Sequence, residues 1–87
     1  MSDRIARPYI RVVQAATTRG AIDLIAVERA VNGSRPEGMT DRELREAARI
    51  LIGRGYSATA IAETLRLSSI VVRRWYPAEL ARELVAS

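Results

Sequence analysis

The chain has 87 residues, with fourteen arginines, no lysine and ten acidic residues, so its net charge is +4. This length predicts one small domain with a marginal core, for which dimerisation would be a natural supplement. The absence of cysteine and histidine excludes disulfides and thiolate metal sites and removes the commonest general base. We therefore expect neither a metal nor any other cofactor.

Membrane insertion and export are not predicted. No stretch approaches the about 20 apolar residues of a membrane span, and the first residues lack the long apolar core of a signal peptide. We therefore expect a cytoplasmic protein, and its basic charge favours a polyanionic partner. That charge is concentrated between Arg66 and Tyr76, where three arginines occur without an acid.

Two helices are predicted before a linker rich in glycine, serine and proline at residues 33–39. Residues 9–18 combine a helical apolar spacing with β-branched residues that also suit a strand; we favour a helix, with Pro8 in its first turn. Residues 21–32 have the apolar spacing of a helix, with Ile22, Ile25, Ala26 and Ala30 on its apolar face. Gly33 suits the left-handed residue that ends a helix.

A third helix is predicted at residues 41–54. Thr40 and Glu43 form a capping box, in which the threonine oxygen accepts from a free amide and the glutamate reaches back. The apolar face of the helix consists of Leu44, Ala47, Ala48 and Leu51, whereas Arg42, Arg45, Glu46 and Arg49 lie largely outside that face. Gly53 and Gly55 are expected to end the helix.

Two short helices follow at residues 58–65 and 69–76, joined by a tight turn. Ser57 has the position and residue type of an N-cap for the first helix. Val72 and Trp75 are three residues apart, so we expect them to share the buried face of the second helix.

Pro77 is expected to break or restart the chain before a short helix at residues 78–86, whose apolar residues are Leu80, Leu84 and Val85. The predicted fold class is all-α: a small helical bundle with a three-helix module at residues 40–76, an N-terminal helical segment and a short C-terminal helix. Residues 1–39 form the N-terminal segment and linker, a possible dimerisation element, and residues 40–87 form the second unit.

Residues 40–76 resemble the homeodomain-like helix-turn-helix proteins of actinobacteria and their phages. The resemblance rests on the capped third helix, on "GYS" before the next helix, on "IAETL" within it and on "VRRW" near the end of the last. Repressors, excisionases, small terminase subunits and transposase N-terminal domains are members of this family. The chain departs from the family where Arg66 replaces the usual turn glycine, at a position that commonly takes a left-handed conformation. It departs again where Ile70 and Val71 replace polar residues of the last helix.

The resemblance implies sequence-specific binding of double-stranded DNA, with helix 69–76 in the major groove. An arginine pairs with guanine or neutralises a phosphate, and aliphatic side chains contact thymine methyl groups. Hydroxyl groups and the free amides of a helix start hold phosphates. The predicted DNA-contacting residues are Ser57, Thr59, Arg66, Ser68, Ser69, Ile70, Val71, Arg73 and Arg74. The expected function is that of a phage or bacterial transcriptional regulator, similar to a repressor or an excisionase.

Several of these residues also have a structural explanation. For Arg73 and Arg74 we favour DNA contact, and the alternative is that they are solvated charges near a helix end. Ser68 and Ser69 are expected to cap the helix, and their hydroxyls would also be able to reach a phosphate. Ile70 and Val71 suit the core or a protein-binding surface as well as contact with DNA. The alternative function is therefore a protein-interaction or oligomeric assembly module, similar to a small terminase subunit or a modulator of a partner protein.

No enzymatic activity is predicted. The acidic residues have the spacings of exposed helix surfaces, as with Glu79 and Glu83 beside Arg82. The segment Gly53–Gly55 lacks the following residues of a phosphate-binding loop. The apolar face of residues 21–31 exceeds what one short bundle needs, so we expect a homodimer.

Overall fold

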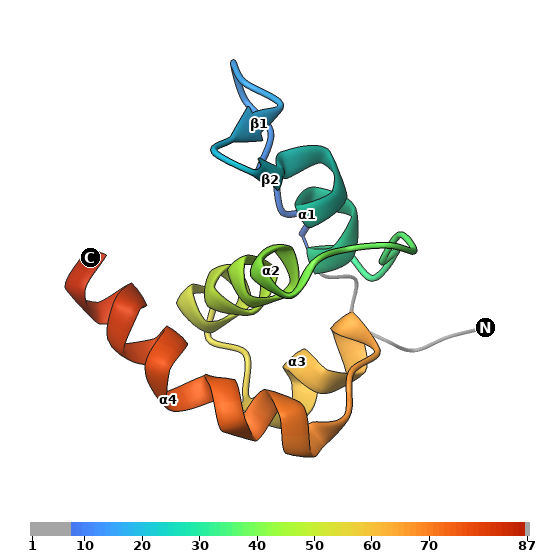
Figure 1. Cartoon of the computed structure of the whole chain (residues 1–87). Helices are drawn as coiled ribbons and strands as arrows, with labels where there is room; N and C mark the ends of the chain where they lie inside the picture. The colour runs from blue at the N-terminus through green and yellow to red at the C-terminus, as the bar shows by residue number, and fades with distance from the viewer. Residues whose placement is uncertain (1–7, 87) are drawn as a thin grey trace.

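A computed structural model describes residues 8–86. Within that range the chain forms a two-stranded hairpin and then four helices, and most residues are helical. The elements are β1 (Thr18–Arg19), β2 (Ile22–Asp23), α1 (Leu24–Val31), α2 (Asp41–Gly53), α3 (Ala58–Leu65) and α4 (Ser69–Ala86). Helix α2 is central and contacts all three other helices, with α1 on one side and α3 and α4 on the other (Figure 1). The all-α prediction is confirmed, apart from the short hairpin.

The limits of α2 and α3 follow from their capping residues. The Thr40 hydroxyl accepts from the Glu43 amide at 3.1 Å, and the Glu43 carboxylate accepts from the Thr40 amide at 3.0 Å, which confirms the capping box. Ser57 caps α3 by accepting from the amide of Ala60. These bonds satisfy amides that have no partner inside the helix, so both helices start where the sequence predicts.

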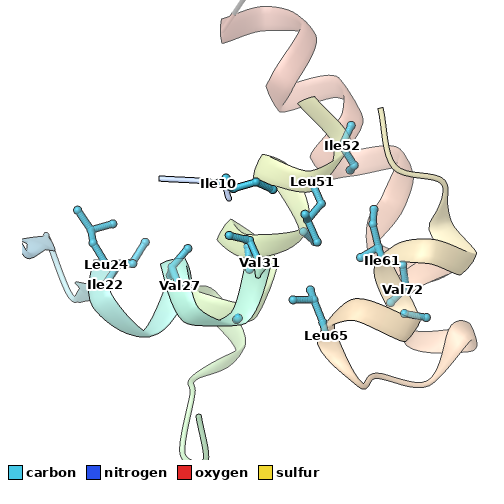
Figure 2. Packing of buried hydrophobic residues seen from close by; sticks show 14 residues of the cluster. Ile10, Ile22, Leu24, Val27, Val31, Leu51, Ile52, Ile61, Leu65 and Val72 are labelled. Atoms are coloured by element: carbon cyan, nitrogen blue, oxygen red, sulfur yellow. The ribbon is translucent and has the colours of Figure 1, made fainter. Parts of the chain in front are cut away.

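One apolar core joins the N-terminal segment to the helices that follow. Val31 of α1, Leu51 of α2 and Leu65 of α3 converge between the three helices, and Val72 of α4 closes the far end (Figure 2). The buried cluster also contains Ile10, Ile22, Leu24, Val27, Ala30, Ala47, Ala48, Ile52, Ile61 and Ala62. The apolar face of α1 is therefore covered within the chain, chiefly by α2.

The predicted helix at residues 9–18 is wrong, because this segment is irregular until β1 begins. The backbone amides of Val12 and Val13 both donate to the Glu28 carboxylate at 2.7 Å. Ile10 exchanges two hydrogen bonds with the Asn32 side chain, at 2.9 and 2.8 Å. These bonds to side chains of α1 and of its C-cap residue replace the bonds that a helix would form within the segment. The hydrogen bond from the Tyr9 hydroxyl is the largest cause of a lowered pKa of Glu28, and the bonds from the Val13 and Val12 amides lower this pKa further.

Helix α1 is shorter than the predicted helix at residues 21–32. It begins at Leu24 because Asp23 caps it, accepting from the amides of Ile25 and Ala26, and Ile22 and Asp23 pair instead with β1. Ile25, expected on the apolar face, is 49% exposed. Gly33 follows the helix with φ of 91°, the left-handed conformation that the sequence predicts.

Pro77 does not divide the last helix, contrary to expectation. Helix α4 is continuous from Ser69 to Ala86, and it bends as it passes α2 (Figure 1). A proline inside a helix removes one backbone hydrogen bond and costs about 3 kcal/mol. Contacts of α4 with both α2 and α3 offset this cost. Leu80 packs against the core, whereas Leu84 and Val85 are exposed.

Three acidic residues are buried, although their spacing indicated exposed positions. Glu43 and Glu46 of α2 and Glu79 of α4 are 7%, 3% and 1% exposed. Glu43 bonds the amides of Thr40 and Asp23, which ties α2 to the hairpin and lowers the Glu43 pKa; the bond from Asp23 is the largest cause. Glu46 and Glu79 each pair with an arginine three residues further along the same helix and with arginines from other parts of the chain.

We use the name acid–arginine network for these ion pairs between α4, α2 and the hairpin. Its members are Glu46, Glu79, Glu83, Arg19, Arg45, Arg49 and Arg82. Burial would raise the pKa of Glu46, but Arg49 and Arg19 outweigh burial and hold that pKa below its ordinary value. The same pairing raises the pKa of Arg49.

Candidate nucleic-acid interface

The connection between α3 and α4 is fixed by backbone conformation and by a distant arginine. Arg66 adopts the left-handed conformation, with φ of 57° and ψ of 46°, as the sequence predicts for the position of the usual glycine. Its carbonyl and that of Leu65 both accept from the Arg35 guanidinium at 3.1 Å. Leu67 donates its amide to the Ala62 carbonyl and packs against the core. Arg35 therefore joins the linker to the end of α3.

The start of α4 is fixed by Ser68 rather than by both serines. The Ser68 hydroxyl accepts from the Ile70 amide at 3.2 Å, and the Ser68 carbonyl accepts from the Val72 amide at 3.1 Å. Ser69 is already the first helical residue, so its predicted capping role is wrong. Its side chain is exposed, as are those of Ser57 and Thr59 at the start of α3.

One side of the first turns of α4 is buried and the other faces solvent. Val72 is 1% exposed and packs with the core, as predicted. Trp75 is only half-buried and lies outside the core, which corrects its predicted role; the Arg45 guanidinium lies 5.6 Å from its ring centroid. This position over the ring is that of a cation–π contact.

Three of the predicted DNA-contacting residues share the opposite side. Ile70, Arg73 and Arg74 are spaced three and four residues apart, so they lie on one side of the helix, and all three are exposed. We use the name α4 exposed face for these three residues. Ile70 is 68% exposed. Val71 is half-buried, so the structure does not group it with them.

The arginines of the α4 exposed face differ from Arg82, further along α4, in whether they form ion pairs. Within residues 8–86, neither Arg73 nor Arg74 forms an ion pair, and the same holds for Arg66. By contrast, Arg82 is bound by two buried carboxylates. The positive charge of the α4 exposed face is thus not neutralised by the described part of the chain.

Sequence reasoning missed Arg35 and the acid–arginine network. Arg35 has no local signal, because its partners are carbonyl groups thirty residues away in the chain. The network had a partial signal, since its members Arg45, Glu46 and Arg49 all lie outside the apolar face predicted for α2.

The acidic groups of residues 8–86 form no set that could hold a metal ion. None of the helices in this range has the length and apolar character needed to cross a membrane. Comparison of the chain with family models, curated proteins and solved structures finds no match.

Proposed function

We propose that the protein binds double-stranded DNA, with α3 and α4 as a helix-turn-helix and the start of α4 in the major groove. One observation carries the proposal: Ile70, Arg73 and Arg74 form one exposed face whose two arginines have no ion pair within residues 8–86. No acid occurs between Arg66 and Tyr76 to repel a phosphate. Unpaired arginines on an exposed helix are the groups that bind guanine edges and phosphates.

The connection between the helices supports this proposal. A recognition helix requires a fixed angle to the helix before it. Here the left-handed Arg66, the Arg35 bonds and the burial of Val72 all restrict that angle. The Arg66 side chain is exposed beside α4, where it would reach the DNA backbone.

Separate roles follow for the groups around the face. Arg73 and Arg74 would contact guanine edges or phosphates, and Ile70 would contact a thymine methyl group. Val71 is half-buried, so only the exposed part of its side chain would contact DNA. The hydroxyls of Ser68 and Ser69 would bond phosphates. At the start of α3, Ser57 and Thr59 lie beside free amides that would hold a phosphate.

A regulatory role in a phage or a bacterium would follow from such binding, similar to that of a repressor or an excisionase. Binding as a dimer is part of the proposal, because paired half-sites are read by two copies. The apolar face of α1 is covered by α2, so the contact between copies would use another surface. Light scattering at high concentration tests this: a dimer supports it, and a 9.6 kDa monomer contradicts it.

Fluorescence anisotropy of a labelled random duplex tests DNA binding itself. Each phosphate that an arginine neutralises releases counterions, so three contacts predict an affinity about 40-fold lower at about 200 mM than at about 50 mM salt. Binding with that salt dependence supports the proposal. No binding at the lower salt concentration overturns it.

A protein-interaction or assembly module is the second candidate, and exposed Ile70 favours it. An aliphatic contact depends little on salt, whereas contacts through arginine weaken as salt rises. Ile70→Ser would then abolish partner binding or assembly without loss of the fold, because the side chain is 68% exposed. If Ile70→Ser leaves assembly intact, this candidate fails.

A further inference from the structure

A second basic surface lies away from the α4 exposed face. The hairpin, α2 and the last turns of α4 line a groove of about 820 Å³ that is open to solvent. Its charged lining consists of Arg19, Arg42, Arg49, Arg82 and Glu46, and its apolar lining consists of Ile22, Ala81 and Val85. We use the name arginine groove for this surface. It shares no residue with the proposed DNA interface.

The groove has more guanidinium groups than its carboxylates neutralise. Arg49 and Arg82 are bound by Glu46, Glu79 and Glu83, so the acid–arginine network fixes them. Arg19 contacts Glu46 through one nitrogen, at 2.5 Å, and remains 63% exposed. Arg42 is exposed and forms no ion pair with any residue from 8 to 86. Arg19 and Arg42 therefore present unused donors at one opening.

Apolar side chains lie beside these donors. Val85 is 87% exposed and lines the groove with Ala81 and buried Ile22. An apolar surface between arginines does not match a DNA backbone, which offers charge and polar sugars. It matches a peptide that carries carboxylates and an aliphatic side chain.

We propose that the arginine groove docks an acidic segment of a partner protein, with carboxylates on Arg19 and Arg42 and an aliphatic side chain on Val85. Arg49 and Arg82, which the acid–arginine network holds in place, also line the groove. Paired donors of a guanidinium hold a carboxylate in a defined orientation, so Arg19 and Arg42 would set the position of the peptide. This docking site is independent of DNA binding, and each can fail without the other.

The probe is a short fluorescein-labelled peptide of glutamates interrupted by two leucines, titrated with the full chain at about 50 mM salt. We expect binding that is lost when glutamine replaces glutamate in the peptide. Arg19→Ala with Arg42→Ala should weaken binding about tenfold, since two charge-assisted contacts are removed. Val85→Ser should weaken it about threefold. All three substitutions are at exposed positions, and circular dichroism checks that the helices persist.

Arg11→Ala with Arg29→Ala is the matched control, because both residues are exposed and neither lines the groove. This control should bind the glutamate peptide like the wild type. Absence of binding, equal binding of the glutamine peptide, or an equal loss in the control overturns the proposal. Loss of duplex DNA binding in the Arg19 and Arg42 variant would instead assign the groove to phosphates. Loss of a wild-type dimer in that variant would assign it to a second copy, and both results also overturn the proposal.

Discussion

The two halves of α4 differ in how they are held and in what their arginines do. Residues 69–76 pack through apolar burial of Val72, and their arginines point to solvent without ion pairs among residues 8–86. Residues 77–86 are held by ion pairs, with Glu79 buried between Arg45 and Arg82. One helix thus has a charged end available to a partner and another end whose charges are used within the fold. Net charge alone cannot distinguish these two uses.

Val72→Ala gives the largest expected effect and tests the apolar half. It removes two buried methyl groups beside α3, so the free energy of unfolding should fall by about 2 kcal/mol. Urea denaturation followed by circular dichroism measures it. Val85→Ala makes the same change at an exposed position and should stay within about 0.5 kcal/mol of the wild type. Equal losses in the two variants would contradict the difference between the halves.

Glu79→Gln tests the ionic half. The carboxylate bonds Arg45 at 2.9 Å and Arg82 at 2.5 Å. Glutamine loses the charge of both pairs, and we expect a loss of about 1.5 kcal/mol in the free energy of unfolding. The arginines remain partly exposed, so they regain water and the loss stays moderate. Glu63→Gln at an exposed site of α3 is the control; a loss as large there would show that Glu79 has no special role.

The ion pairs of Glu46 should have a smaller effect on the stability of the fold, and this effect should depend on pH. Its pKa in the folded protein lies below the ordinary value of 4.5. Its ion pairs therefore stabilise the fold above pH 4.5, and this contribution is lost as the pH falls through the lower, folded-state pKa. Thermal melts from pH 7 to about pH 3 should show a falling Tm, and Glu46→Gln should flatten that fall. An identical pH profile for the variant would contradict the assignment.

Local signals made the middle of the chain predictable. The capping box of Thr40 and Glu43, the Ser57 cap and the left-handed positions of Gly33 and Arg66 each depend on a few neighbouring residues. The positions and types of α2 and α3 followed from these signals. The exposed positions of Arg73 and Arg74 agree with both roles considered for them, DNA contact and solvated charge.

Long-range partners explain most of what the sequence did not predict. Residues 9–18 had helical spacing, but Glu28 takes the amides of Val12 and Val13. Pro77 had the local character of a helix break, but packing against α2 keeps α4 continuous. Glu79 had an exposed spacing, but its arginine partners include one from α2. Each outcome depends on contacts between segments far apart in the sequence.

Substitution of the two arginines on the α4 exposed face tests the proposed DNA interface most directly. Arg73→Ala with Arg74→Ala is compared with Arg11→Ala and Arg29→Ala, which removes the same charge from exposed positions outside the interface. Anisotropy with one duplex at about 50 mM salt should show binding about 100-fold weaker for the first variant. The second variant should stay within about threefold of the wild type. Equal losses, or no loss in the first variant, would contradict DNA binding through α4.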